Sequence, residues 1–212
     1  MLNSNYLKIL KEIGIDEIFI KRGNMIEDKI KILEKINKEI QECKKCDLYK
    51  NRKQAVLGEG NPDTKLMFIG EAPGADEDKL GRPFVGRAGK LLTSIIESLG
   101  YKREQFYIAN VNKCRPPGNR TPTPWEQEAC FPFLEKQIDI INPNVLCLLG
   151  AAAARAFLQR NVAITKERGK ILNWKDKKLI LTFHPAYVLR NPSAESLLTK
   201  DIEKAIELAY FN

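Results

Sequence analysis

Residues 66–78 have the sequence LMFIGEAPGADED, in which a short apolar run ends at a glycine and leads directly into a loop of glycine, proline and acidic residues. Apolar runs of the same kind recur at 106–111 (FYIANV), 145–149 (VLCLL) and 179–183 (LILTF). Patterns typical of helices lie between these runs, at 89–99, 124–141, 151–158 and 195–210. Apolar strands that alternate with helices predict an α/β fold, with a mostly parallel sheet of four strands covered by helices on both faces.

The composition agrees with one globular domain that has a short appendage. The chain has 212 residues, of which 43% are hydrophobic and 29% charged. No apolar run approaches the ~18 residues that a membrane span requires, and the N-terminus lacks the pattern of a secretion signal. We therefore exclude membrane proteins, secreted disulfide scaffolds and fibrous proteins. The 35 Lys and Arg against 27 Asp and Glu give a net charge of +8, which favours a polyanionic partner.

Residues 1–40 differ from the rest of the chain and predict a helical extension that packs on a main domain at 41–212. Two amphipathic patterns carry this prediction. The first places apolar side chains at helical spacing and ends at Gly14: Tyr6, Ile9, Leu10 and Ile13. The second follows Gly23-Asn24, with one apolar stripe: Ile30, Leu33, Ile36 and Ile40.

Three of the four predicted strands are followed by loops in which glycine, proline, carboxylate and amide groups gather, at 70–86, 110–120 and 184–192. Ligands of open α/β sheets bind outside the carboxyl ends of the strands, so we expect these loops to form one pocket. Each loop alone is also explained as a turn, and GEAPG matches neither a phosphate-binding loop nor a dinucleotide fingerprint. The coincidence of three such loops is what predicts a site.

Two side chains in these loops each have a structural and a functional interpretation. His184, the only histidine, directly follows a predicted strand and precedes Pro185, a context that favours function over a structural hydrogen bond. Phe84 lies between Pro83 and Val85 in a loop flanked by glycines. Its ring fits either a small satellite core or a flat surface on which a nucleic-acid base stacks.

The cysteines predict a metal site. A C-x2-C pair, a cysteine after the second strand and another inside the helix at 124–141 together supply four thiols: Cys43, Cys46, Cys114 and Cys130. Four thiolates suit either zinc or an iron–sulfur cluster. Disulfides are the alternative, which a chain of cytosolic type disfavours. Cys147, between two leucines, is expected to be a small buried hydrophobic residue.

Taken together, these segments resemble the family 4 uracil-DNA glycosylases, the iron–sulfur branch of the uracil-DNA glycosylase superfamily. The matching stretches occur in the family's order: CKKC at 43–46, GEAPGADED at 70–78, GRPFVG at 81–86, NVNKCRPPGNR at 110–120 and HPAYVLRNP at 184–192. They cover roughly residues 41–205, so the N-terminal 40 residues lie outside the resemblance.

The resemblance implies a three-layer αβα sandwich around a central four-stranded, mostly parallel sheet, and a [4Fe-4S] cluster on the four cysteines named above. It also implies a uracil pocket whose backbone lining is Gly70, Glu71 and Ala72. In that pocket Phe84 stacks on the base, Asn110 reads its amide edge and His184 faces O2. Two further positions match residues associated with activity: Glu77 and Asn119.

The implied reaction is DNA repair, in which uracil is flipped out of DNA and its N-glycosidic bond hydrolysed to leave an abasic site. In the best-known branch of the superfamily an aspartate follows a Gly-Gln pair in the first loop, whereas Ala72 stands at that place here. Glu71 and Glu77 remain as candidates to orient the water. We therefore expect this chain to depend more on stabilising the leaving uracil, through His184 and nearby backbone N–H groups, than on a general base.

Basic residues near the pocket motifs are candidates for phosphate contacts, with a solvated surface charge as the alternative for each. These are Arg87, Lys113, Arg115, Arg120 and Arg190. The side chain that fills the gap left by the flipped base is expected to be one of three: Val188, Leu189 or Arg190.

The expected partner is uracil-containing DNA, single- or double-stranded, bound by a monomer in the cytoplasm of a bacterial or archaeal cell with no membrane involvement. Two other functions fit part of the pattern. One is a non-enzymatic nucleic-acid-binding module built on a four-cysteine zinc or iron–sulfur site. The other is a family 5 glycosylase with a broader range of damaged bases, against which Glu71 argues because that branch lacks this carboxylate. An electron carrier fits poorly, because its cysteines would lie closer together in sequence.

Overall fold

The computed structural model describes residues 25–211, and the first of the two predicted N-terminal helices lies outside them. Its centre is a six-stranded sheet in the order β1-β3-β2-β4-β6-β5. The strands are β1 (Glu59–Gly60), β2 (Leu66–Gly70), β3 (Tyr107–Asn110), β4 (Val145–Leu149), β5 (Ile171–Trp174) and β6 (Lys177–Thr182). No helix among the described residues is long and apolar enough to cross a bilayer.

The four strands expected from the sequence are the parallel centre of the sheet, and the expected number of four was wrong because two edge strands add to them. β2 pairs in parallel with β3 and β4, and β4 pairs in parallel with β6. The added strands, β1 and β5, run antiparallel to their neighbours. Neither resembles an apolar run, because β1 has only two residues and β5 alternates exposed with half-buried side chains.

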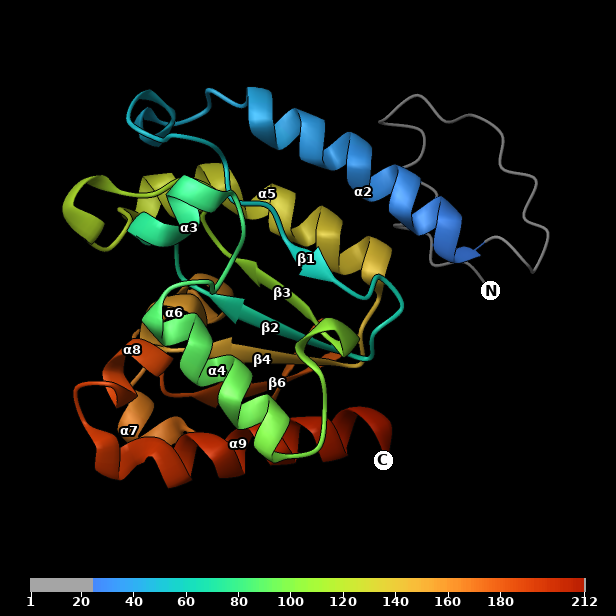
Figure 1. Ribbon diagram of the computed structural model, residues 1–212, viewed down its shortest axis with the longest axis vertical. Coiled ribbons are helices and arrows are strands. Elements are labelled where there is room, and N and C mark those ends of the chain that lie inside the picture. Colours follow the sequence, from blue (N-terminus) through green and yellow to red (C-terminus); the bar gives the residue numbers. More distant parts are fainter. Residues whose placement is uncertain (1–24, 212) are drawn as a thin grey trace.

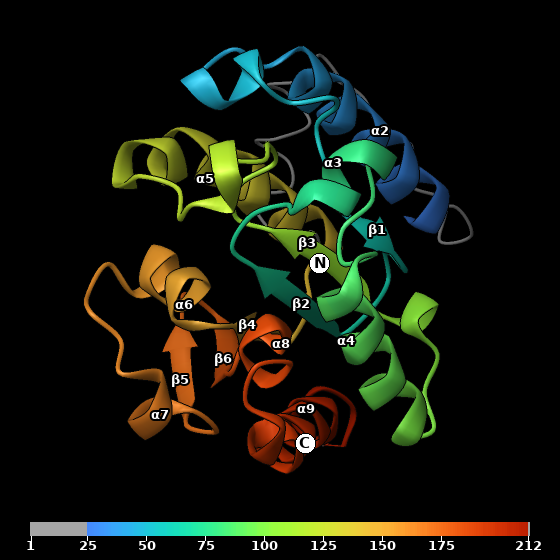
Figure 2. The ribbon, with the colours of Figure 1, turned by 60° about the vertical axis from the view of Figure 1, so that its left-hand side comes forward.

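Helices cover both faces of the sheet, which gives the expected three layers (Figures 1 and 2). The α-helices described are α2 (Met25–Glu42), α3 (Ala75–Leu80), α4 (Arg87–Ser98), α5 (Pro124–Ile141), α6 (Ala151–Leu158), α7 (Ile164–Glu167), α8 (Pro185–Val188) and α9 (Glu195–Tyr210). Short 3-10 helices lie at η1 (Asp47–Lys50), η2 (Arg103–Gln105), η3 (Pro117–Asn119) and η4 (Pro192–Ala194). One face of the sheet packs on α2, α5 and α6, and the other on α4, α8 and α9.

Successive side chains of each central strand point to opposite faces of the sheet, so every strand contributes to the hydrophobic core on each face. In β2, Met67 and Ile69 belong to the core under α2, α5 and α6, whereas Leu66 and Phe68 belong to the core under α4 and α9. Strands with side chains buried on both faces read as continuous apolar runs, which is why the sequence displays the parallel strands so clearly.

Helix α2 packs on the main body, as its amphipathic pattern predicted. Its buried residues, Ile32, Leu33, Ile36 and Ile40, join the core that includes α5. Ile30 was placed on this stripe from the sequence but is exposed, and Ile32 takes its place. The helix continues to Glu42, past the point at residue 40 where the expected extension ends.

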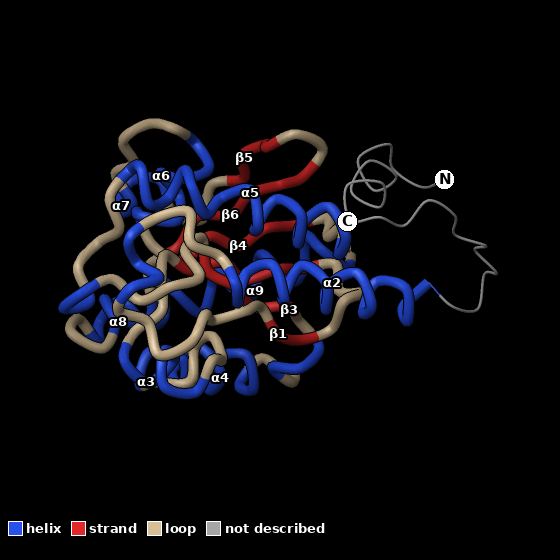
Figure 3. The backbone as a smooth tube through the Cα atoms, turned by 90° about the horizontal axis from the view of Figure 1, so that it is seen from above, coloured by secondary structure: helices blue, strands red, loops and turns tan. Residues whose placement is uncertain are grey.

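The parallel strands point to one end of the molecule, and the loops after β2, β3 and β6 gather there with α3 and α8 (Figures 1 and 3). The fold therefore carries three chain segments, far apart in the sequence, to one edge of the sheet, where a ligand site is expected.

Candidate active site

A cavity of about 450 Å³ opens at this edge of the sheet. Its lining comes from the segments at 71–77, 84–88, 110–120 and 184–190. The loops that follow β2, β3 and β6 therefore meet in one pocket, as the order of strands and loops in the sequence predicted.

Phe84, Asn110 and His184 lie together in this cavity. The ring centroids of Phe84 and His184 are 5.7 Å apart, with planes inclined by 30°. A Cβ atom on Gly70 would lie 2.4 Å from Asn110 Oδ1 and 2.5 Å from Phe84 Cζ, so both side chains pack over Gly70 and only glycine leaves them room. An aromatic ring, an amide and an imidazole thus border one space.

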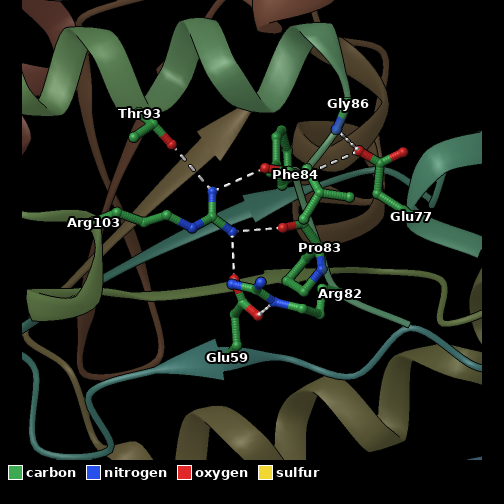
Figure 4. Close-up of polar contacts among 9 residues, drawn as sticks. Glu59, Glu77, Arg82, Pro83, Phe84, Gly86, Thr93 and Arg103 are labelled. Carbon is green, nitrogen blue, oxygen red and sulfur yellow. Dashed lines mark hydrogen bonds and ion pairs between the residues drawn. The ribbon is translucent and has the colours of Figure 1, made fainter. Parts of the chain in front are cut away.

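Glu77, in α3, connects the first loop to the loop that carries Phe84, which we call the Phe84 loop (residues 81–86). Its Oε2 accepts a hydrogen bond from the backbone N–H of Gly74 at 3.1 Å. Its Oε1 accepts from the N–H groups of Val85 at 3.0 Å and Gly86 at 2.8 Å (Figure 4). Glu77 lines the cavity, but three backbone donors occupy its carboxylate, so the geometry gives it a loop-holding role.

Glu71 offers a carboxylate oxygen that is free of protein partners. It follows β2 and lines the cavity beside Ala72. Its buried Oε1 accepts no hydrogen bond from the described residues. Burial raises the pKa of Glu71, although a hydrogen bond with the Thr121 side chain and the positive charge of Arg155 act in the opposite direction. Of the two candidate carboxylates, Glu71 is therefore the one able to take a water molecule.

His184 caps the N-terminus of α8, and this contact fixes its tautomer. Its Nδ1 accepts a hydrogen bond from the backbone N–H of Ala186 at 3.1 Å, so a neutral imidazole carries its proton on Nε2. Burial, aided by the positive charge of Arg190 and opposed by Glu77, lowers the pKa of His184 to about 4. At neutral pH the ring is thus an uncharged donor.

Polar side chains form the mouth of the cavity. Asn119, Arg120 and Arg190 are exposed and line it. The Asn119 Oδ1 accepts a hydrogen bond from Arg115 Nε at 2.7 Å, and the Arg120 guanidinium makes two bonds to the Glu126 carboxylate, at 2.8 and 2.7 Å. Arg190 and the half-buried Arg115 make no such ion pair among the described residues, whereas Arg120 is held by Glu126.

Two of the expected DNA contacts are wrong. Lys113 is fully buried, and its Nζ donates to the carbonyl oxygen of Asn110 at 2.8 Å and to Gln137 Oε1 at 2.6 Å, so it cannot reach a phosphate. Val188 is buried in the core under α4 and α9 and cannot enter a DNA stack. Leu189 is exposed, as a residue that fills a base gap must be.

Other residues stand at or beside the cavity. Arg87 is exposed at the first position of α4 but does not border the cavity. Tyr187 was missed by sequence reasoning, although it lies in the same loop as His184. It lines the cavity, is exposed, and stacks on Phe183 with ring centroids 4.9 Å apart. An aromatic residue three positions after His184 in a predicted pocket loop was the signal that could have found it.

The four cysteines predicted to bind a metal also come together, in a second, small cavity beside α5. They are free thiols from the segment after α2, the loop after β3, and α5 itself: Cys43, Cys46, Cys114 and Cys130. Cys147 lies apart from them in β4, fully buried, as expected. As the side chains stand, no three ligating groups among residues 25–211 are close enough to hold a single metal ion.

Nitrogen donors surround the cysteine sulfurs. Cys114 Sγ accepts from Arg52 Nη1 at 3.1 Å, Cys130 Sγ from the backbone N–H of Lys113 at 3.3 Å, and Cys43 Sγ from that of Lys45 at 3.5 Å. Burial raises the pKa of Cys130 to about 12, although the Lys113 charge lowers it. Such thiols become thiolates readily only when a cationic centre binds them.

Comparison with known proteins places this arrangement in a family. Residues 57–207 match the model of the uracil DNA glycosylase superfamily. The chain is 53% identical over 178 residues to the type-4 uracil-DNA glycosylase of Thermotoga maritima, covering 82% of this chain and 93% of that protein. It is 50% identical over 186 residues to the type-4 enzyme of Sulfurisphaera tokodaii, covering 84% of each.

The comparisons also bear on the alternative functions. The type-5 uracil-DNA glycosylase of Pyrobaculum aerophilum is 28% identical over 144 residues, covering 60% of this chain, and is thus a more distant relative than the type-4 enzymes. The relatives named here are all glycosylases by name, which does not match a non-enzymatic binding module. The type-4 branch therefore describes this chain better than either alternative.

Proposed function

Because the chain belongs to the uracil DNA glycosylase superfamily, we propose that it excises uracil from DNA, hydrolysing the N-glycosidic bond and leaving an abasic site. The observation that carries this function is the single cavity in which Phe84, Asn110 and His184 meet at the ends of neighbouring strands. A base that enters it must leave the DNA stack, at a free-energy cost of about a few kcal/mol that is lower when it is mismatched or single-stranded.

Discrimination between bases comes from Asn110. Phe84 provides a π face, which any base accepts. The Asn110 amide can donate to uracil O4 and accept from N3–H, whereas cytosine offers the opposite pattern. A buried amide left unpaired by the wrong base costs about 1–3 kcal/mol, which gives the site its preference.

His184 stabilises the leaving base. As the bond between N1 and C1′ breaks, negative charge gathers on uracil, chiefly at O2. The bond from Ala186 to Nδ1 leaves the proton of the neutral His184 ring on Nε2, which bonds to none of the residues 25–211 and can donate to that oxygen. Removal of one such donor costs roughly 10²–10³ in rate. The depressed pKa of His184 keeps the donor neutral, so the ring acts by hydrogen bonding without transferring its proton.

Water reaches the sugar with the help of Glu71. The transition state of glycosidic hydrolysis resembles an oxocarbenium ion, which a carboxylate stabilises while it orients the attacking water. The unpartnered Oε1 of Glu71 supports this role, and the three backbone bonds to Glu77 support a positioning role for that residue instead. Asn119, at the mouth of the cavity, is placed to contact the nucleotide that carries the base.

The four cysteines fit a [4Fe-4S] cluster. Soft thiolate ligands suit iron–sulfur chemistry, and N–H groups directed at the sulfurs, here from Arg52, Lys45 and Lys113, are typical of such sites. When bound, the cluster supplies a cross-link between the segment after α2, the loop after β3, and α5. The ligands in this proposal are Cys43, Cys46, Cys114 and Cys130.

The DNA lies across the mouth of the cavity in this proposal. The proposed phosphate contacts are Arg190, which lines the mouth, and Arg115, which bonds to Asn119 there. Arg87, at the start of α4, is a further candidate, while Arg120 contributes only if it leaves Glu126. Leu189, exposed after α8, fills the gap left by the flipped base. The proposal keeps the expectation of a monomer that acts on DNA in the cytoplasm of a bacterial or archaeal cell.

A labelled oligonucleotide with one uracil tests the function. After incubation and alkali treatment we expect a strand break at uracil and none at cytosine or thymine. His184→Ala and Asn110→Ala should lower the single-turnover rate by roughly 10²-fold or more and leave the binding of undamaged DNA unchanged. Asn161→Ala, a change at an exposed asparagine outside the cavity, is the matched control. Absence of any break with the wild-type protein would overturn the proposal and favour a binding module.

A further inference from the structure

The Phe84 loop has a backbone conformation that its own sequence does not favour. Phe84 has φ +52°, in the left-handed region that side chains other than glycine rarely adopt. A bulky residue persists there only when surrounding contacts determine its conformation. The loop also presses against α4, because a Cβ atom on Gly89 would lie 1.9 Å from the Phe84 carbonyl oxygen. The contacts that hold this conformation therefore determine where the aromatic ring lies.

One arginine outside every pocket motif holds the carbonyl side of this loop (Figure 4). Arg103 comes from η2, between α4 and β3, and its side chain is 11% exposed. Its Nη1 donates to the Phe84 carbonyl at 2.9 Å and to Thr93 Oγ1 at 3.4 Å. Its Nη2 donates to the Pro83 carbonyl at 2.5 Å and to Glu59 Oε1 at 2.7 Å. Two successive carbonyl groups of the loop are thus fixed by one guanidinium.

Glu59 holds that guanidinium in turn. It lies in β1, which pairs with β3, the strand that ends at Asn110. The Glu59 carboxylate also accepts from Arg82, at 2.7 and 3.2 Å. Burial opposes the charge of Glu59, but hydrogen bonds from Arg82 and Arg103 outweigh it and lower the pKa of the carboxyl below its usual range. The Arg103–Glu59 pair therefore ties the Phe84 loop to the edge of the sheet.

We propose that Arg103, oriented by Glu59, is a positioning residue for base recognition: it fixes the Phe84 ring at the distance from Asn110 and His184 that a stacked base requires. The inference rests on the proposed excision of uracil. Arg103 does not border the cavity, so in this proposal it acts through the Phe84 loop. Glu77 holds the other end of the loop, at Val85 and Gly86, and leaves the carbonyl groups of Pro83 and Phe84 to Arg103.

A double-mutant cycle separates positioning from general support of the fold. Arg103→Ala should lower the single-turnover excision rate by roughly 10–100-fold and weaken inhibition by free uracil, because a small displacement of the ring is enough to lose alignment. In a Phe84→Leu background, assayed with enzyme in excess, the same change should have little further effect. Arg103→Lys should recover only part of the activity, since one ammonium cannot bridge both carbonyls and Glu59.

Arg160→Ala is the matched control, because Arg160 is an exposed arginine that also pairs with a carboxylate, that of Glu167, but neither borders the cavity nor contacts the Phe84 loop. Its rate should stay close to that of the wild type. If Arg103→Ala fails to fold, Glu59→Gln completes the same cycle with Phe84→Leu while Arg103 is retained. An equal loss of rate in both Phe84 backgrounds, or no loss in a folded Arg103→Ala protein, would overturn the proposal. A wild-type protein that excises no uracil would instead overturn the proposed function itself.

Discussion

The protonation of His184 gives the sharpest test of the site, because a single histidine in the chain makes its titration unambiguous. Burial lowers the pKa of His184 from 6.5 to about 4, with Arg190 acting in the same direction and Glu77 against it. One pKa unit corresponds to 1.36 kcal/mol, so this difference amounts to about 3 kcal/mol in favour of the neutral ring.

The sign of the linkage follows from the direction of this change. Between pH 6.5 and about 4, His184 is protonated in the unfolded chain but neutral in the folded protein. The free energy of unfolding should therefore fall by up to about 3 kcal/mol from this residue as the pH drops through that window, and His184 should have no effect above it. The excision rate should likewise not fall near pH 6.5, because His184 stays neutral there.

NMR of a protein labelled with ¹³C in the imidazole ring measures the titration directly. The folded protein should show a midpoint near 4, and the same sample in denaturant a midpoint near 6.5. Arg190→Gln should move the folded midpoint upward, because it removes a positive charge that disfavours the protonated ring. A folded midpoint at or above 6 would refute the assignment of His184 as a buried neutral donor.

Three further predictions concern other parts of the two sites. Gly70→Ala should abolish excision while DNA binding persists, because the added methyl group would lie 2.4 Å from Asn110 Oδ1 and 2.5 Å from Phe84 Cζ; an active variant would contradict the close packing. Glu71→Gln should reduce the single-turnover rate by less than roughly 10²-fold with unchanged affinity for DNA, and a rate equal to the wild type would remove Glu71 as the residue that orients water. Cys114→Ser should lose the brown colour of the cluster together with thermal stability, and a colourless wild type that contains zinc on analysis would refute the iron–sulfur assignment.

The sequence displays best the features that depend on periodicity and order along the chain. The central strands are apolar on both faces, so β2 and β4 appear as runs of hydrophobic letters. Loops that follow parallel strands meet at one edge of the sheet, so the order of strands and loops in the sequence already groups Phe84, Asn110 and His184. The edge strands lack this signature, because β1 has only two residues and the side chains of β5 alternate between exposed and half-buried.

Features that depend on partners from distant segments could not be predicted. Lys113 is a basic residue in a pocket loop, as a phosphate contact would be. Its ammonium group is nevertheless buried and bonds to Gln137, 24 residues away in α5. Arg103 lies in a connection between α4 and β3 that carries no motif, and only the path of the Phe84 loop brings two carbonyl groups to its guanidinium. A charge in a sequence does not disclose whether it meets solvent or a carbonyl group.

Lys113 connects the cysteine centre to the pocket. It lies between Asn110, whose carbonyl oxygen accepts from its Nζ at 2.8 Å, and Cys114, and its own N–H donates to Cys130 Sγ at 3.3 Å. A buried ammonium group needs compensating negative charge, and its hydrogen-bond partners among the described residues are neutral oxygens. If the four cysteines held the proposed cluster, their thiolates would supply that charge close to Lys113, whose ammonium group holds the end of β3. Loss of the proposed cluster would then disturb the position of Asn110 through Lys113, whose backbone N–H bonds to Cys130 and whose side chain bonds to the Asn110 carbonyl. This effect requires no redox step.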